Sequence, residues 1–210
     1  PDTRFALELE DATEVMRGSQ LAVFAGAEAV RFLRVPRVYS RSELAGLEEV
    51  AKERGARGLA YLVRDEGGEV RSPIAKFLSD AELEALRLEP GQTLLFAADA
   101  WEATSRVLGH LRLVVARQLG LVDESAFSFL WVTDFPLLEW DEESGRWSAV
   151  HHPFTRPTEE WRERFADEPA AALADAYDLI VNGNELGGGS FRISEPENKS
   201  QENENQLQSP

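Results

Sequence analysis

Three consecutive glycines near the end of the chain lie between two side chains of opposite charge. The glycines are Gly187, Gly188 and Gly189; Glu185 precedes them and Arg192 follows them. Glycine weakens the interior of a strand, so glycines there often mark a place where another group approaches the backbone. A flat platform with a carboxylate at one end and a guanidinium at the other suits a nucleotide together with an anionic substrate. The alternative is a glycine-rich hairpin whose charged side chains are simply solvated.

The segment before the glycines predicts the first arm of a hairpin. Residues 177–182 alternate, which puts Asp178 and Ile180 on one side of a strand and Leu179 on the other. Asn182-Gly183 is a turn dipeptide. We therefore expect the glycine segment to form the second strand of this hairpin.

Two adjacent histidines, His151 and His152, stand directly before Pro153. Neighbouring side chains of an extended chain point in opposite directions, so we expect at most one of the two to face a ligand directly. A metal site is weakly supported, because no third ligand has suitable spacing and the chain has no cysteine. The alternative is a polar loop that only connects two elements.

Composition narrows the class of protein. A chain of 210 residues with 43% hydrophobic residues fits one or two globular domains with ample core. The formal charge of -16 argues against a free-standing protein that grips nucleic-acid phosphates. The absence of cysteine suits a reducing cytoplasm, and no apolar run is long enough to cross a membrane. Because Pro1 rather than methionine opens the chain, we expect it to begin in mid-fold.

The first hundred residues predict short strands and capped helices. Strands are expected over residues 4–10, 21–24, 30–35, 59–63 and 93–97. Ser40 and Ser79 each precede a glutamate by three residues, which predicts capping boxes at the start of two helices, the first running to about residue 54. A hairpin turn is expected at residues 65–68.

Asp99 is expected to cap the longest helix, with Glu102 three residues further on. The predicted buried stripe of this helix consists of Trp101, Leu108, Leu111, Val115 and Leu119. His110 lies beside the stripe and is interpreted as structural. Residues 127–133 then predict a strand buried on both faces, and residues 137–150 a hairpin with Trp140 and Trp147 on its two arms.

Several strings closely resemble those of bacterial aspartyl-tRNA synthetases, which are class II ligases. They are Glu185-Leu-Gly-Gly-Gly-Ser-Phe-Arg192, Val150-His-His-Pro-Phe-Thr155 and the Trp-Val-x-Asp-Phe-Pro pattern that contains Asp134. Three further blocks resemble the GAD domain, a module inserted in these synthetases and also found in a tRNA-dependent amidotransferase. Those blocks are residues 55–61, 72–78 and 95–99.

The resemblance implies roles for the candidate residues. Glu185 would bind ATP through Mg²⁺, Arg192 would grip the side-chain carboxylate of aspartate, and His151 would contact the amino acid. His152 would belong to the same substrate loop, and the three glycines would leave room for the ligand. Asp134 is interpreted as a strand cap rather than a site residue, and Lys76 as a surface cation rather than a contact for an RNA phosphate. The implied partners are aspartate, tRNA and a second subunit in a homodimer, with no membrane.

The resemblance also implies an α+β fold in which a GAD-type α/β insertion interrupts part of a class II antiparallel sheet. We expect residues 1–19 at the edge of the catalytic core, 20–121 in the insertion, 122–193 in the partial core, and 194–210 as a disordered or non-family tail. Two class II motifs, Phe-Arg-x-Glu and Gly-x-Gly-x-Gly-x-x-Arg, do not occur in the sequence. We therefore expect a fragment that is inactive by itself. The alternatives are a GAD-bearing tRNA- or partner-binding module without catalysis, and an unrelated nucleotide-binding α+β protein.

Overall fold

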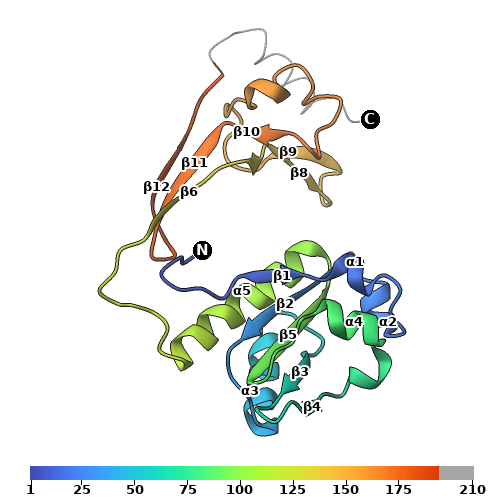
Figure 1. The fold of residues 1–210 in the computed structure, drawn as a ribbon. Coiled ribbons are helices and arrows are strands. Elements are labelled where there is room, and N and C mark those ends of the chain that lie inside the picture. Colours follow the sequence, from blue (N-terminus) through green and yellow to red (C-terminus); the bar gives the residue numbers. More distant parts are fainter. Residues whose placement is uncertain (194–210) are drawn as a thin grey trace. The chain divides into compact units, whose positions relative to one another are not determined.

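The computed structural model describes residues 1–193, which divide into two compact units (Figure 1). One unit is Phe5–Glu124; the other contains Pro1–Arg4 and the chain from Ser125 onward. Both combine helical segments with antiparallel strand pairs, which confirms the expected α+β class. The predicted tail, residues 194–210, lies outside the described residues, and the predicted limits of an insertion at 20 and 121 stay predictions.

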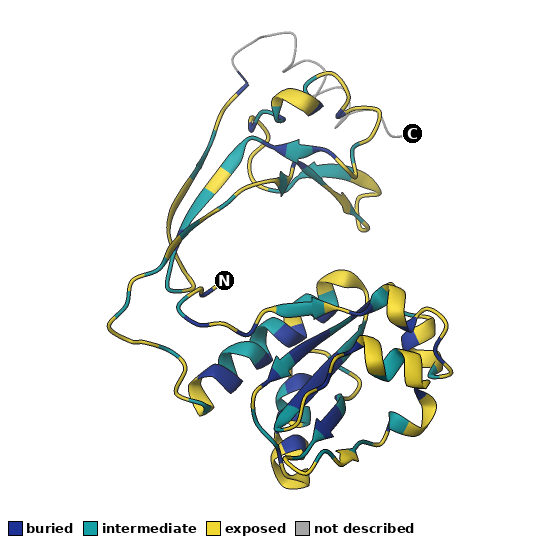
Figure 2. Cartoon of the chain, in the orientation of Figure 1, coloured by how far each residue is buried: buried dark blue, intermediate teal, exposed yellow. Residues whose placement is uncertain are grey.

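A five-stranded antiparallel sheet in the order β1-β2-β5-β3-β4 forms the centre of the Phe5–Glu124 unit. Its strands are β1 (Leu9–Asp11), β2 (Ala29–Val35), β3 (Ala60–Arg64), β4 (Val70–Arg71) and β5 (Gln92–Asp99). The neighbouring strands β2 and β5 pair from Ala29 opposite Asp99 to Val35 opposite Thr93, and most of their residues are buried (Figure 2). The apolar residues on both faces of these strands explain why helical segments cover the sheet on two sides.

Alternate residues of the sheet belong to two separate cores. Leu33 and Leu95 pack with the helices α3 (Arg41–Lys52) and α5 (Trp101–Gln118). Phe32 and Phe96 point the other way and pack with residues of three short helices. Those helices are α1 (Thr13–Met16), α2 (Ala22–Ala25) and α4 (Asp80–Ala85), and a single 3₁₀ turn, η1 (Ala75–Phe77), precedes α4. The period of two along each strand therefore separates the two cores.

Both predicted capping boxes are confirmed. The Ser40 side chain accepts a hydrogen bond from the Glu43 amide, and the Glu43 carboxylate accepts one from the Ser40 amide. Ser79 and Glu82 form the same pair of bonds at the start of α4. Each box satisfies two backbone N–H groups that the first helical turn leaves without an intrahelical acceptor.

Two strands expected in this unit are wrong. Residues 21–24 are the N-cap and first residues of the short helix α2 instead of a strand, and the Phe24 ring packs in the core with its centroid 5.5 Å from that of Phe96. The strand expected over residues 4–10 is limited to β1, since the backbone at Leu7 has a φ of 84° that interrupts an extended run. The side chain of Leu7 is nevertheless buried, and its carbonyl accepts a hydrogen bond from Arg112.

The start of α5 also differs from the expectation. Asp99 is the last residue of β5, where it pairs with Ala29, and the N-cap position is occupied by Ala100 without a side-chain cap. Trp101 is 55% exposed and lies outside the buried stripe, and its ring faces the Arg31 guanidinium at 5.4 Å. Pairing with β2 thus extends β5 past the position where the local sequence favours a cap.

The other unit is built from small antiparallel pairs. Its strands are β6 (Phe129–Val132), β7 (Phe135–Pro136), β8 (Leu138–Asp141), β9 (Arg146–Ala149), β10 (Leu173–Ala174), β11 (Ala176–Val181) and β12 (Asn184–Ser190). They form a three-stranded sheet in the order β12-β11-β6 and the pairs β7-β10 and β8-β9. The predicted tryptophan hairpin is confirmed, with Trp140 opposite Trp147 and their rings 5.6 Å apart.

The core of this unit is small. Five residues are buried together: Leu137, Trp161, Phe165, Ala172 and Ala174. Trp161 belongs to a 3₁₀ turn, η2 (Glu159–Trp161). The expectation that residues 127–133 are buried on both faces is wrong, because Phe129 and Trp131 of β6 are 59% and 61% exposed. Among the described residues of the whole chain, no helix is long and apolar enough to cross a membrane.

Candidate functional site

The predicted glycine-rich hairpin is present as β11 and β12. Asn182 and Gly183 connect the two strands, and both have positive φ values, 50° and 84°. Two consecutive residues with positive φ are typical of the type I′ turn that joins antiparallel strands most tightly. The Asn182 amide group also accepts a hydrogen bond from the Ser128 N–H at 2.9 Å and donates one to the Ala126 carbonyl at 3.0 Å.

A β-bulge interrupts the hairpin beside the glycines. Leu179 lies opposite Gly187 and Ile180 lies opposite Glu185, so Leu186 has no partner on β11. In a regular strand, two residues separated by an odd number of positions face opposite sides. Glu185 and Arg192 are seven positions apart, and the one extra residue at the bulge therefore brings their side chains to the same face.

Contacts near the end of β12 support this shared face. Gly188 lies opposite Asp178, and Glu185 lies opposite Ile180; directly opposed residues of an antiparallel pair share a face. The hydroxyl oxygen of Thr155 lies 3.3 Å from the Ser190 hydroxyl and accepts a hydrogen bond of 3.3 Å from Arg192 Nη1. Ser190 and Arg192 therefore point the same way. We call this side of β11 and β12 the charged face; it carries Asp178, Glu185 and Arg192.

The opposite side of the same sheet is aromatic. Trp131 and Tyr177 meet edge to face with ring centroids 5.6 Å apart, and Tyr177 lies 6.5 Å from Phe191. Trp131, Tyr177 and Phe191 are all exposed. We call this side the aromatic face. The charged groups that could act on a ligand are thus confined to one side of a thin sheet.

The three glycines serve different purposes. A Cβ atom added at Gly188 would lie 2.0 Å from Asp178 Oδ1, and one added at Gly189 would lie 2.8 Å from the Tyr177 hydroxyl. A Cβ added at Gly187 would meet nothing within 4 Å. Side chains from β11 therefore cover Gly188 and Gly189, and the open position at Gly187 lies opposite Leu179 on the aromatic face. The expected bare platform between Glu185 and Arg192 is wrong, because Asp178 occupies the space at Gly188 on the charged face. Asp178 is the carboxylate of the charged face that sequence reasoning did not single out.

The two histidines point to different neighbours, as their adjacency predicts. The His151 ring meets Phe135 edge to face at 4.9 Å, whereas the His152 ring lies 5.5 Å from Phe154. His152 Nδ1 accepts a hydrogen bond of 3.1 Å from the Phe154 N–H, so this nitrogen helps to shape the loop. Both side chains are exposed.

The histidine loop is attached to the segment that carries Arg192. Thr155 forms an antiparallel bridge with Arg192, and the Ile193 N–H donates to the Phe154 carbonyl at 2.9 Å. The Arg156 N–H donates to the Phe191 carbonyl, also at 2.9 Å. These backbone bonds bring two sequence-predicted pieces of the site together although they are about forty positions apart. Arg192 uses one terminal nitrogen on Thr155, and its other terminal nitrogen forms no hydrogen bond with the described residues.

Glu185 lies at the other end of the charged face. Six residues of extended chain, one of them Leu186 in the bulge, separate it from Arg192, which corresponds to roughly 20 Å along the strand. The Glu185 side chain is exposed and forms no ion pair with any described residue. The charged face therefore suits a long ligand that carries positive or metal-bound groups at one end and a carboxylate at the other.

Other candidates are less closely connected with this face. Asp134 follows β6 with a φ of 61°, and its carboxylate accepts a hydrogen bond from the Thr133 hydroxyl. Lys76 belongs to the Phe5–Glu124 unit, where its ammonium lies 4.8 Å from the Phe77 ring. Within the described part of the chain, no three histidine, cysteine or acidic side chains form a metal-binding group.

Comparison with known proteins identifies the family. The family model described as class II tRNA synthetases (D, K and N) matches residues 1–209. The chain belongs to the class II tRNA synthetases. The matched residues include the histidine loop and the glycine hairpin.

Curated relatives within this synthetase family are nearly half identical to the chain. The aspartate–tRNA ligase of Agathobacter rectalis is 48% identical over 203 residues, which cover 92% of this chain and 34% of the relative. The aspartate–tRNA ligase of Geobacillus kaustophilus is 48% identical over 206 residues, covering 93% and 35%. The aspartate–tRNA(Asp/Asn) ligase of Oleidesulfovibrio alaskensis is 49% identical over 199 residues, covering 92% and 33%. The chain thus spans about a third of the length of these synthetases.

Proposed function

We propose that this chain is part of an aspartate–tRNA ligase, which activates aspartate with ATP and transfers it to tRNA. The observation that carries the proposal is the charged face, where the bulge at Leu186 aligns Glu185 with Arg192 beside the histidine loop. The membership of the class II synthetases and the printed activity of the similar proteins support it. Relatives with the Asp and the Asp/Asn names match equally well, so the proposal includes either tRNA specificity.

Arg192 is the residue that we propose to bind the side-chain carboxylate of aspartate. Its guanidinium is held by Thr155 on one side, which fixes the direction of the planar group while the remaining N–H groups stay available. A guanidinium can bind a carboxylate through two parallel hydrogen bonds, a geometry that lysine cannot reproduce. His151 and His152, carried by the loop attached to the Arg192 segment, would line the amino-acid end of the site.

Glu185 is proposed to hold ATP through Mg²⁺ at the other end of the charged face. Mg²⁺ prefers oxygen ligands and usually keeps several waters while it binds one or two carboxylates and the substrate phosphates. Glu185, together with Asp178 on the same face, fits this donor set without a third protein ligand. The ion would neutralise phosphate charge when bound. On this face, Gly188 leaves the space that the Asp178 carboxylate occupies, whereas Gly187 and Gly189 lie opposite Leu179 and Tyr177 on the aromatic face.

The proposed reaction needs positioning more than covalent chemistry. The α-carboxylate of aspartate attacks the α-phosphate of ATP and pyrophosphate leaves. A hydroxyl of the terminal adenosine of tRNA then attacks the carbonyl of the adenylate, so that the aspartyl ester forms, the hydroxyl loses its proton and AMP leaves. Holding two substrates in line lowers the barrier because their relative freedom is lost on binding, before the reaction step. A rigid hairpin with its charges on one face provides such positioning at the two ends of the bound pair.

The remaining parts of the proposal concern the whole ligase. We propose that residues 20–121, within the Phe5–Glu124 unit, are a GAD-type insertion, supported by the three sequence blocks 55–61, 72–78 and 95–99. We also propose that the complete enzyme is a cytoplasmic homodimer. A GAD-bearing binding module without chemistry would have no use for the charged face.

The test is a chimeric ligase in which residues 1–193 replace the matching segment of the Geobacillus kaustophilus enzyme. We expect the chimera to catalyse aspartate-dependent exchange of pyrophosphate into ATP within about tenfold of the parent. This expectation rests on the identity of 48% over 206 residues between the chain and that enzyme. A folded chimera that binds ATP but shows no aspartate-dependent exchange would refute the proposed function. Circular dichroism and thermal unfolding of the same sample establish whether the chimera is folded.

A further inference from the structure

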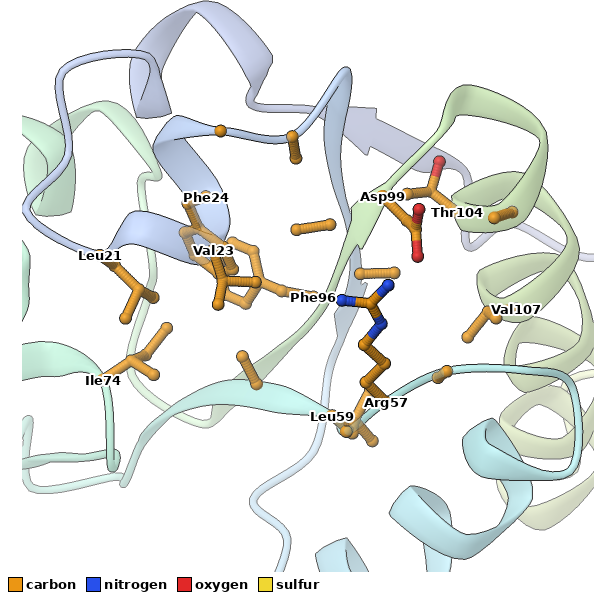
Figure 3. Close-up of a pocket in the computed structure, with 18 of the residues that line it drawn as sticks. Leu21, Val23, Phe24, Arg57, Leu59, Ile74, Phe96, Asp99, Thr104 and Val107 are labelled. Atoms are coloured by element: carbon orange, nitrogen blue, oxygen red, sulfur yellow. The ribbon is translucent and has the colours of Figure 1, made fainter.

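A cavity of about 600 Å³ opens in the Phe5–Glu124 unit, and the proposed ligase chemistry makes no use of it (Figure 3). Small-molecule sites generally enclose about 300–1,000 Å³, so the size is suitable for a ligand. Each of the three GAD-like sequence blocks contributes to its lining, which includes Arg57, Ile74 and Phe96. Three blocks that are separate in the sequence therefore lie around one cavity.

The cavity exists because one strand of the sheet ends early. The pairing of β3 with β5 stops at Ala60 and Phe96, whereas β2 remains paired with β5 as far as Asp99. Residues 97–99 therefore have a strand neighbour on one side only. The lining of twenty residues includes three glycines and seven alanines, so side chains do not fill the space that the missing strand leaves.

The walls of the cavity are apolar and come from both cores of the unit. Phe24 and Phe96, with rings 5.5 Å apart, belong to one core, and Leu59 and Val107 belong to the other. Val23 at the rim is 65% exposed. An apolar group that entered the cavity would cover this exposed surface, and burial of apolar area is favourable by about 25 cal/mol per Å².

Two opposite charges mark one side of the cavity. Arg57 reaches from the loop before β3 toward the end of β5, where Asp99 lies (Figure 3). Arg57 is exposed and forms no hydrogen bond or ion pair with the described residues. Asp99 Oδ1 accepts a hydrogen bond from the Ala100 N–H at 2.8 Å, and its other oxygen forms no hydrogen bond with residues 1–193. The Thr104 hydroxyl already donates to the Trp101 carbonyl at 2.8 Å.

We propose that this cavity binds a small zwitterion with an apolar body, of which a free apolar α-amino acid is the simplest example. The planar guanidinium of Arg57 would bind the carboxylate, Asp99 would bind the ammonium group, and the side chain would lie against Phe24 and Phe96. A simple anion would be repelled by Asp99 and a simple cation by Arg57. Aspartate does not fit, because its second carboxylate would face apolar walls without a partner.

The ligand class can be tested with the ¹⁵N-labelled 210-residue chain by NMR titration. L-phenylalanine and L-leucine should shift amide signals of residues 22–27, 55–60 and 96–104 with a saturable response. Two analogues of L-phenylalanine test the contribution of each charged group: 3-phenylpropionate lacks the ammonium group, and phenethylamine lacks the carboxylate. We expect each to bind at least tenfold more weakly than L-phenylalanine, and L-aspartate to cause no shifts in these regions.

Matched variants test the residues. Arg57→Gln and Asp99→Asn should each weaken binding of L-phenylalanine at least tenfold, and Ala103→Leu should block it by filling the cavity. Arg54→Gln, which removes a nearby charge outside the lining, should leave binding unchanged. Absence of saturable shifts up to about 10 mM of either amino acid would overturn the site. Equal or tighter binding of 3-phenylpropionate, or normal binding by Arg57→Gln, would overturn the zwitterion assignment. The ligase proposal does not depend on either result.

Discussion

Arg192 allows the proposed aspartate site to be tested with a single substitution that preserves charge. Lysine in its place would keep the positive charge but lose the planar pair of donors, so Arg192→Lys should raise the KM for aspartate while the KM for ATP changes little. A loss of about 2–3 kcal/mol is expected for a desolvated, charge-assisted pair, which corresponds to roughly 30- to 150-fold. Pyrophosphate exchange by the chimeric ligase measures both constants.

Arg162→Lys is the control for this substitution. Arg162 lies in the same unit but pairs with Glu159 on the surface, 3.0 Å away, and has no place on the charged face. Its replacement should change neither constant. A raised KM for ATP with an unchanged KM for aspartate in Arg192→Lys would contradict the assignment, because it would place the guanidinium at the nucleotide end.

The glycines offer a second comparison at the scale of residues. Gly188→Ala would put a Cβ atom 2.0 Å from Asp178 Oδ1 and 3.0 Å from the Tyr177 carbonyl oxygen. The Asp178 carboxylate would therefore have to move. Gly187→Ala meets nothing within 4 Å. We expect Gly188→Ala to lower the stability of the hairpin by about 1–2 kcal/mol relative to Gly187→Ala. Hydrogen exchange of the β11 amides measures the difference; equal protection in the two variants would show that Gly188 is not required by Asp178.

At the scale of elements, predictions that rest on neighbouring residues were the successful ones. The capping boxes at Ser40 and Ser79 and the turn at Asn182-Gly183 each need only a few adjacent side chains, so the sequence contains the whole cause. The bulge at Leu186 could not be predicted, because it depends on which residues of β11 and β12 lie opposite each other. The sequence therefore indicated the residue types of the candidate site, whereas the register placed Glu185 and Arg192 on one face.

The unsuccessful predictions share a dependence on distant partners. α2 packs against Phe96, about seventy positions away, and β5 continues to Asp99 because β2 is there to pair with it. β6 has the apolar composition of a fully buried strand, but nothing in the described chain covers its aromatic face. The composition of a strand therefore indicates how much apolar surface it can bury, but it does not identify the element that packs against it.

The Ser40 capping box should give α3 a pH-dependent stability. Hydrogen bonds from Ser40 lower the pKa of Glu43 below its ordinary value of 4.5, the backbone N–H having the larger effect. Because the pKa is lower in the folded state, the contribution is present above pH 4.5 and is lost as the pH falls through the lowered value. Glu43→Gln should therefore reduce stability at pH 7 and have less effect near pH 3.

Ser40→Ala tests the other half of the box and should cost about 1 kcal/mol at pH 7. Ser42→Ala is the control: Ser42 is exposed, lies two residues later as the second residue of α3, and its replacement should be neutral or slightly stabilising because alanine has the higher helix propensity. Urea unfolding monitored by hydrogen exchange within α3 measures each change. A Glu43→Gln effect that stays the same from pH 7 to pH 3 would contradict the role of the ionised carboxylate.

At the scale of the whole molecule, the two units differ in how much apolar surface they bury. The Phe5–Glu124 unit has two core clusters of sixteen and twelve buried residues, whereas the other unit has one cluster of five. The latter also exposes the aromatic face, on which Phe129, Trp131 and Phe191 are all more than half exposed. Stability follows largely from apolar burial, so the units are expected to unfold separately.

Hydrogen exchange of the 210-residue chain in increasing urea should therefore show two transitions. Amides of β11 and β12 should lose protection first, because only a three-stranded sheet and a small core hold them. Amides of β2 and β5, at the centre of the five-stranded sheet, should keep their protection to a urea concentration at least about 1 M higher.

The double variant Phe129→Thr with Trp131→Thr is the control. It should leave the β2 and β5 transition unchanged and reduce any self-association through the aromatic face. Loss of protection in all four strands at one urea concentration would show that the two units fold as a single cooperative body.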